Sequence, residues 1–165
     1  MFELEDLEEL FDDLDYDTPT PEQIYKMYGI FLRDFEEIPL YVNGKLVKYN
    51  HNPSKSPMFR GKSESFVHVV TRESKIKERR DFDHQRANRI HWIRPILENR
   101  GSNEIWYFER INDRNQMQYY YWYESQNFLV ILRTIEPDVL LVTSFYVDKD
   151  SKPKFRRWYQ EYKKL

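Results

Sequence analysis

Histidine and arginine side chains are the residues of this chain best suited to chemistry on a phosphate group. His68 stands in the apolar run 65–71, and Arg86 and Arg89 stand in the segment 86–99. An imidazole titrates near neutral pH, and a guanidinium binds phosphate through two parallel hydrogen bonds. Cleavage of RNA without a metal needs a proton acceptor, a proton donor and cations for the phosphorane oxygens, because the 2′-hydroxyl attacks the neighbouring phosphate.

His68 lies in a segment with period-two alternation, which predicts a strand over 65–71. In such a strand it is either a core histidine or a catalytic base. Thr143 lies in a second predicted strand, 139–147, where threonine is common for its β propensity alone. Its hydroxyl could also hold the scissile phosphate, or orient His68 if the two strands lie close together.

The arginines differ in the direction that a helix would give them. Arg86 and Arg89 are three residues apart and share a helix face, whereas Arg89 and Arg94 are five apart and do not. We therefore expect Arg86 and Arg89 to bind the phosphate together. Arg86 extends the apolar stripe of this helix, and therefore either passes the edge of the core or points into a cleft. Arg94, with a surface position before Pro95, and Arg72, just after the histidine strand, are further substrate-binding candidates.

Ser144 and Tyr146 complete the substrate-binding candidates, although alternation places Ser144 on the strand face opposite Thr143, which favours a structural role. His84 and His91 lie seven apart on the predicted helix. Without a third ligand beside them, solvated polar positions are favoured over a zinc site. The chain contains no Cys, which excludes disulfides and cysteine nucleophiles. We expect no metal and no other cofactor.

The elements that must position these residues are those of an α+β protein. An amphipathic stripe predicts a helix over 3–15, and Thr20 with Pro21 marks the start of a second helix over 21–34. Asn43-Gly44 suits a hairpin between 38–42 and 45–49. A helix from Asp81 or Asp83 to 98 should pack on an antiparallel meander. The expected meander strands are 105–109, 117–124, 128–134 and 139–147, followed by a helix over 154–165. The aromatic run 119–123 should alternate between two faces, with cross-strand packing favoured over stacking on bases.

Charge is distributed unevenly along the chain. Residues 1–25 hold ten acidic and no basic residues, and the remainder holds 26 basic and 18 acidic residues, a net charge of +8. A basic body favours a polyanionic partner, and the acidic helix should dock either on this body or on a second copy in a homodimer. The acidic N-terminus does not resemble a signal peptide, and no apolar run reaches the roughly 18 to 20 residues of a membrane span. These features predict a soluble, cytoplasmic protein without membrane contact.

The segments 65–71, 86–99, 128–132 and 141–147 together resemble phage and mobile-element nucleases of the barnase–EndoU–colicin–RelE type. The resemblance covers residues 59–165 and leaves 1–58 as an acidic helical segment with a hairpin, within one compact domain. It implies a metal-independent endoribonuclease of prophage origin and toxin-like character, with RNA as substrate and an antitoxin or immunity protein as a possible partner. It also implies His68, Arg86, Arg89 and Thr143 as catalytic residues. The alternative is a non-catalytic module that binds RNA or a protein with the same fold.

Overall fold

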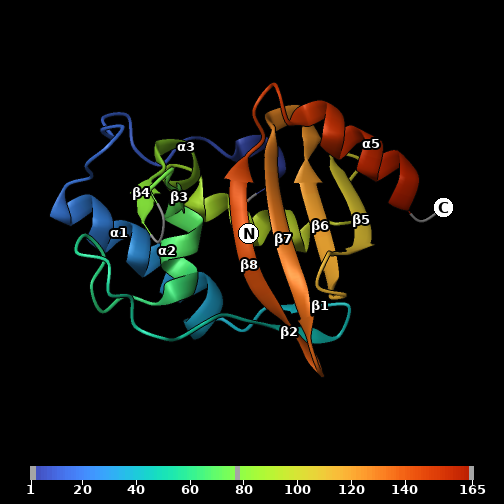
Figure 1. Ribbon diagram of the computed structural model, residues 1–165, viewed down its shortest axis with the longest axis horizontal. Helices are drawn as coiled ribbons and strands as arrows, with labels where there is room; N and C mark the ends of the chain where they lie inside the picture. Colours follow the sequence, from blue (N-terminus) through green and yellow to red (C-terminus); the bar gives the residue numbers. More distant parts are fainter. Residues whose placement is uncertain (1–2, 77–78, 164–165) are drawn as a thin grey trace.

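A six-stranded sheet forms the centre of the protein in the computed structural model, which describes residues 3–76 and 79–163 (Figure 1). The strand order is β1-β2-β8-β7-β6-β5, and β5 to β8 form an antiparallel meander. β2 joins β8 in parallel through only two residue pairs, so the rest of β8 has no strand partner on that side among the described residues. The strands are β1 (Tyr41–Val42), β2 (Lys45–Lys48), β5 (Ile105–Ile111), β6 (Met117–Tyr123), β7 (Phe128–Ile135) and β8 (Asp138–Tyr146).

Helices cover both faces of this sheet and its β8 edge. They are α1 (Pro21–Leu32), α2 (Glu64–Val70), α3 (His84–Ala87), α4 (Ile93–Glu98) and α5 (Lys152–Tyr162). α4 packs on one face, α5 crosses part of the opposite face, and α2 lies along the upper part of β8 (Figure 1). A small second sheet joins β3 (Thr71–Glu73) to β4 (Arg80–Phe82). Among the described residues, no helix has the length and apolar content needed to span a membrane.

The α+β class and most expected elements are confirmed. Thr20 caps α1 in a reciprocal capping box with Gln23, and Pro21 occupies the first helical turn. Asn43 and Gly44 adopt φ angles of 51° and 76°, as the tight turn between β1 and β2 requires. The four meander strands and the C-terminal helix lie where the sequence places them, within a few residues. One core cluster draws side chains both from the first 58 residues and from the rest.

The predicted strand over 65–71 is wrong, because residues 64–70 form α2. Phe66, Val69 and Val70 are fully buried in this helix, and Val67 is nearly so. A short helix buried on almost every side has no polar face, so its apolar run cannot be distinguished from a strand by periodicity. Tertiary packing has overridden the β preference of the three valines.

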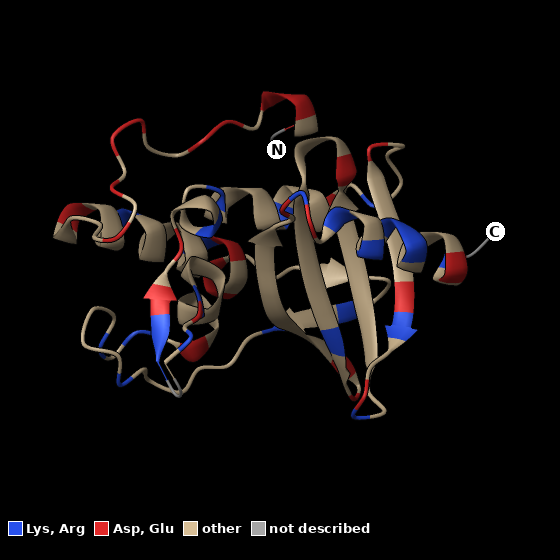
Figure 2. Ribbon diagram, turned by 45° about the horizontal axis from the view of Figure 1, so that its top comes forward, with Lys and Arg blue, Asp and Glu red and all other residues tan. Residues whose placement is uncertain are grey.

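The predicted helix over 3–15 is also wrong. Only Leu4–Asp6 form a single 3₁₀ turn, and residues 3–17, here called the N-terminal strap, otherwise run without regular structure over the body. Figure 2 shows this strap as a strongly acidic trace beside the helices. A helix would place like charges at the i,i+4 pairs Glu5–Glu9, Glu8–Asp12 and Glu9–Asp13, which disfavours it. The apolar residues Leu4 and Leu14 are instead buried in the chain's own core, so the strap packs within one molecule.

The helix expected to reach residue 98 is broken at Asn88. Asp83 caps α3 through the Arg86 amide, as expected, but α3 ends at Ala87. The Asn88 carbonyl accepts the Leu10 amide of the strap, and the Trp92 amide bonds to Arg89 instead. In a continuous α-helix the Asn88 carbonyl would accept the amide of Trp92. Because it accepts the amide of Leu10 instead, the helix is interrupted by the 3₁₀ turn Ile90–Trp92.

The aromatic run on β6 divides between two cores, as alternation predicts. Tyr121 and Tyr123 lie in the core under α4, whereas Tyr120 and Trp122 lie in the core under α5. Cross-strand ring contacts with β5 occur at 4.5 to 5.5 Å, including Phe108–Tyr120 and Trp106–Trp122. These rings stabilise the sheet and are not available as a stacking platform.

Candidate active site

The C-terminal end of α2 is capped by side chains from four other positions of the chain. The last carbonyls of a helix have no partner within the helix, and here the Val67 carbonyl accepts the Thr71 hydroxyl at 2.6 Å. The Thr71 carbonyl accepts Nη1 of Arg86 at 2.7 Å and Nη2 of Arg80 at 3.0 Å. Two cations at this end also stabilise the negative pole of the helix dipole. The arrangement holds His68, in the last turn, in a defined position.

Arg86 takes a positioning role at this helix end. Its Nη1 donates to the His68 carbonyl at 3.1 Å and to the Thr143 hydroxyl at 3.3 Å, and its Nε lies 3.4 Å from the Asp83 carboxylate. Burial lowers the pKa of Arg86 to about 10, so the side chain stays charged at neutral pH. The guanidinium therefore acts first as a clamp on main-chain oxygens.

Thr143 reaches the same point from β8. Its hydroxyl donates to the His68 carbonyl at 3.3 Å while accepting from Arg86. A β-bulge at Val142 makes this possible, because Ile131 pairs with Thr143 whereas the adjacent Leu132 pairs with Leu141. Bulges reorient the side chains that follow them. The structure thus brings His68, Arg86 and Thr143 together, with the contact made through the main chain of His68.

The imidazole of His68 faces a cavity of about 170 Å³ at the sheet edge. The cavity is lined by Asn50, Ser65, His68, Arg133 and residues 140–142 of β8. Burial, followed by the charges of Arg80 and Arg86, lowers the pKa of His68 below its usual value. Neither ring nitrogen has a hydrogen-bond partner among the described residues. His68 is therefore a neutral imidazole near pH 7, free to accept a proton from a molecule in this cavity.

Arg133 on β7 is the residue of this cavity that the sequence analysis did not predict. Its side chain forms no hydrogen bond or ion pair with any described residue. The sequence did contain a signal, because Arg133 follows the buried Leu132 and must point to the opposite face of β7. That signal alone does not identify a site, because the sequence does not show that His68 lies on a helix beside β8.

The other predicted arginines are bound elsewhere. Arg89 reaches Gln85 and the Glu9 carboxylate of the strap, and its guanidinium lies over the rings of Trp92 and Tyr146. It does not join Arg86, because the break after Ala87 ends the helical spacing between them. Arg72 donates to the Phe82 carbonyl at 2.9 Å across β3 and β4.

Arg94 was expected at the surface, and instead it clamps the end of the helical segment 33–37. Its Nη1 donates to the carbonyls of Asp34 and Ile38, and its Nη2 donates to the carbonyl of Pro39 at 3.4 Å. The Nε atom lies 3.4 Å from Glu98. Only 14% of the side chain is exposed. These bonds give Arg94 a structural role.

Ser144 and Tyr146 lie away from the His68 cavity. Ser144 is fully buried and its hydroxyl has no partner among the described residues. Tyr146 lines a separate cavity of about 350 Å³ together with Arg72 and His84. His84 and His91 are half-buried, and the Nδ1 atom of each has no hydrogen-bond partner among the described residues. Among the described residues, no group of three or more His, Asp or Glu side chains is placed to hold a metal ion.

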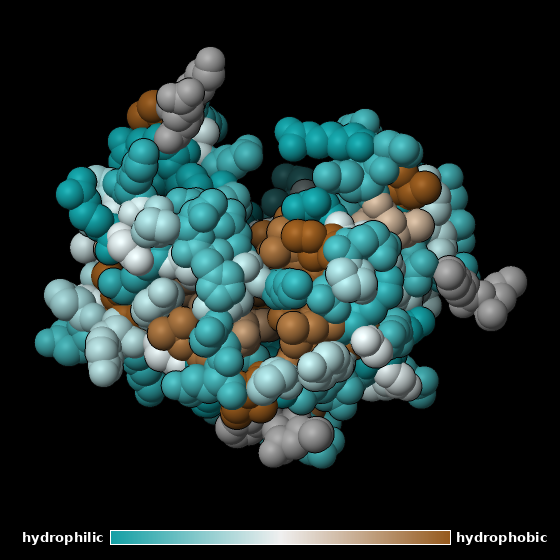
Figure 3. Space-filling view, turned by 90° about the horizontal axis from the view of Figure 1, so that it is seen from below, coloured by the Kyte–Doolittle hydropathy of each residue, from teal (hydrophilic) through white to brown (hydrophobic). Residues whose placement is uncertain are grey.

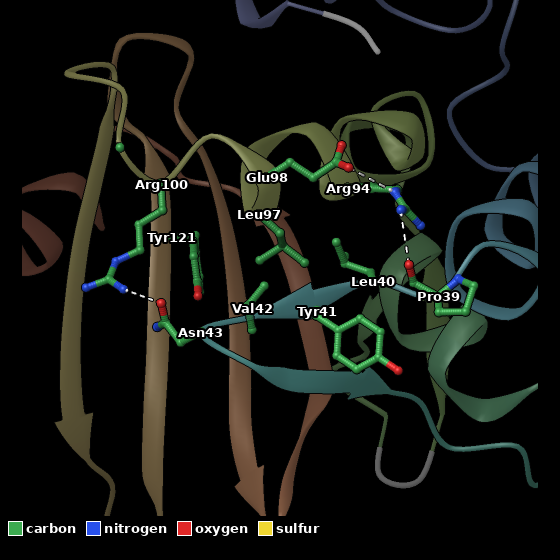
Figure 4. A pocket seen from close by; sticks show the side chains of 11 residues that line it. Pro39, Leu40, Tyr41, Val42, Asn43, Arg94, Leu97, Glu98, Arg100 and Tyr121 are labelled. Carbon is green, nitrogen blue, oxygen red and sulfur yellow. Dashed lines mark hydrogen bonds and ion pairs between the residues drawn. The ribbon is translucent and has the colours of Figure 1, made fainter.

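We describe five cavities. The largest of them, about 480 Å³, lies between the β1–β2 hairpin and α4 (Figure 4), and the next, about 370 Å³, lies between the helical segment 33–37 and α4. Leu40, Val42 and Leu97 line the largest cavity, and Figure 4 shows that its two arginines bond to the protein itself. Arg94 bonds Glu98 and Pro39, and Arg100 donates to the Asn43 side chain at 2.9 Å. It lacks the combination of a free base and a free cation that the His68 cavity has.

Comparisons of this chain with protein-family models, curated proteins and solved structures returned no match.

Proposed function

We propose that this protein is a metal-independent endoribonuclease with His68 as its catalytic base. The observation that carries the proposal is a neutral imidazole without a protein partner in a cavity beside the unpaired guanidinium of Arg133. A general base works best when its pKa lies near the working pH and a site for its proton donor is open beside it. An unpaired cation stabilises the extra negative charge of a phosphorane.

The reaction would proceed through the substrate's own 2′-hydroxyl. His68 takes the proton of that hydroxyl, and the 2′-oxygen forms a bond to the adjacent phosphorus. Arg133 binds the non-bridging oxygens while the bond to the 5′-oxygen breaks. The leaving 5′-oxygen takes a proton from solvent, so that the products are a 2′,3′-cyclic phosphate and a 5′-hydroxyl. Arg86 and Thr143 serve as positioning residues that hold the His68 main chain.

Incubation of the purified protein with total RNA in the presence of a chelator tests this proposal. We expect cleavage that a 2′-deoxy substrate abolishes and that His68→Ala lowers by about 10² to 10⁴. The exposed His51, which stacks on Tyr49, provides the matched control, and His51→Ala should retain activity. Equal cleavage by His68→Ala, or loss in chelator that a divalent ion restores, contradicts the proposal. RNA binding without any cleavage would favour the non-catalytic module.

A further inference from the structure

Two cavities on the α5 side of the sheet meet at Arg133 and Val142. One is the His68 cavity, and the other, of about 350 Å³, extends to the turn between β5 and β6. The strand register connects them, because Gln118 of β6 pairs with Arg133 of β7 and Arg133 pairs with Leu140 of β8. Directly paired residues lie on the same face of a sheet. They therefore form one row that runs from the β5–β6 turn to the edge where His68 lies.

This part of the sheet is open to a ligand. α5 crosses the sheet near the top of the view in Figure 1, and the lower part of the same face carries no helix. Seen from below, the surface is hollowed between the helical half on the left and the half formed by the sheet and α5 (Figure 3). The row that contains Arg133 lies on the α5 side of the sheet, below α5.

The unpaired cations of the five cavities are found in these two. Among the cavity-lining arginines, the following bond to protein oxygens: Arg33, Arg72, Arg94 and Arg100. Arg133 and Arg114, by contrast, form no side-chain hydrogen bond or ion pair with the described residues. The lining of the cavity around Arg114 also contains one carboxylate, that of Asp113. Two free cations, Arg133 on this row and Arg114 in the adjacent β5–β6 turn, suit successive phosphates of a nucleic-acid strand.

The remaining polar side chains of this lining are amides. The Oε1 atom of Gln118 accepts the Tyr120 hydroxyl at 2.8 Å, so its amide nitrogen is left to donate to a ligand. Asn112 and Gln116 bond to each other at 3.3 Å beside it. Amide side chains recognise the edges of unpaired bases in RNA-binding proteins. A volume of about 350 Å³ is near the lower end for a small-ligand site, which suits one nucleotide and is too small for a base-paired duplex.

We propose that the cavity around Arg114 and Gln118 is a subsite for the nucleotide next to the cleaved phosphate, and that the substrate class is single-stranded RNA. This inference rests on the proposed endoribonuclease function. Arg133 contacts the scissile phosphate, Arg114 contacts the adjacent phosphate, and the amides contact the base between them. Substrates that extend into this subsite bind more tightly than a dinucleotide.

Binding of fluorescein-labelled RNA to the His68→Ala protein separates this inference from the proposed reaction. The probes are a single-stranded hexanucleotide, a dinucleotide and the same hexanucleotide sequence within a duplex. We expect Arg114→Gln to weaken hexanucleotide binding about tenfold and to reduce the slope of log affinity against log salt by about 0.7. Dinucleotide binding should change less than twofold. Arg60→Gln, an exposed arginine that lines none of the five cavities, makes the same charge change and should leave binding unaltered.

Equal hexanucleotide affinities for the Arg114→Gln and Arg60→Gln proteins would overturn the subsite, and tighter binding of the duplex would overturn the single-stranded substrate class. Either result leaves RNA cleavage by the native chain as a separate measurement. Conversely, if the native chain cuts no RNA but Arg114→Gln still loses hexanucleotide affinity, the proposed reaction is refuted and the cavity around Arg114 and Gln118 is retained as a binding site. Gln118→Ala gives a second test, because it removes an amide and no charge: it should lower hexanucleotide affinity without changing the salt slope.

Discussion

Replacement of Asn88 by alanine should release the N-terminal strap and destabilise the whole protein. Asn88 is fully buried, and its Oδ1 atom accepts the Phe11 amide at 2.7 Å. Its Nδ2 atom donates to the Phe11 carbonyl at 3.0 Å and to the Glu9 carboxylate at 3.2 Å. Each such bond contributes about 1 kcal/mol net, and a buried peptide group left without a partner costs roughly 1 to 3 kcal/mol. We therefore expect Asn88→Ala to lower the free energy of unfolding by about 2 to 4 kcal/mol.

A domain of this size loses about 2 to 4 °C in Tm for each kcal/mol, so the Tm should fall by roughly 4 to 16 °C. Thermal and urea denaturation measure the loss, and hydrogen exchange at the Phe11 amide reports the strap itself. Asn103, exposed in the turn before β5, provides the control, because its side chain has no hydrogen bond to the described residues. A Tm within about 2 °C of that of Asn103→Ala, or unchanged protection of the Phe11 amide, would refute the strap's role.

Two further predictions concern Arg94 and the pH dependence of stability. Arg94→Gln removes the clamp on the carbonyls after α1 and should cost about 2 to 4 kcal/mol in urea denaturation; an unchanged urea midpoint would show that these carbonyls are satisfied by water. Burial lowers the pKa of both His68 and His91 in the folded chain, so below about pH 6.5 the unfolded chain binds more protons and stability should fall with decreasing pH. His68→Gln and His91→Gln should each flatten this dependence in urea titrations between about pH 7 and pH 5, and a native chain that gains stability on acidification contradicts the stated direction.

Local chemistry made much of the fold predictable. The capped start of α1, the Asn43-Gly44 turn and the alternating strands of the meander each depend on a few adjacent residues. The strap and α2 depend on distant partners instead. Leu10 bonds to Asn88 across the fold, and α2 is buried among other elements, so neither is determined by its own periodicity.

The candidate site was predictable in part. His68, Arg86 and Thr143 were expected to lie together, and their atoms do meet, but the helical position of His68 places its carbonyl rather than its imidazole at the contact. The bulge at Val142 that reorients Thr143 leaves no mark in the residue types. Arg133 became a candidate only when the fold placed it in the same cavity as His68.

The pH dependence of RNA cleavage in chelator tests the central claim most directly. If His68 is the base, the single-turnover rate of the native chain should rise with pH and level off above an ionisation below about pH 6.5, because the histidine pKa is lowered in the folded protein. His68→Ala should lose that ionisation together with most of its rate, while His51→Ala retains both. An identical pH profile and rate in the native and His68→Ala proteins would contradict the account.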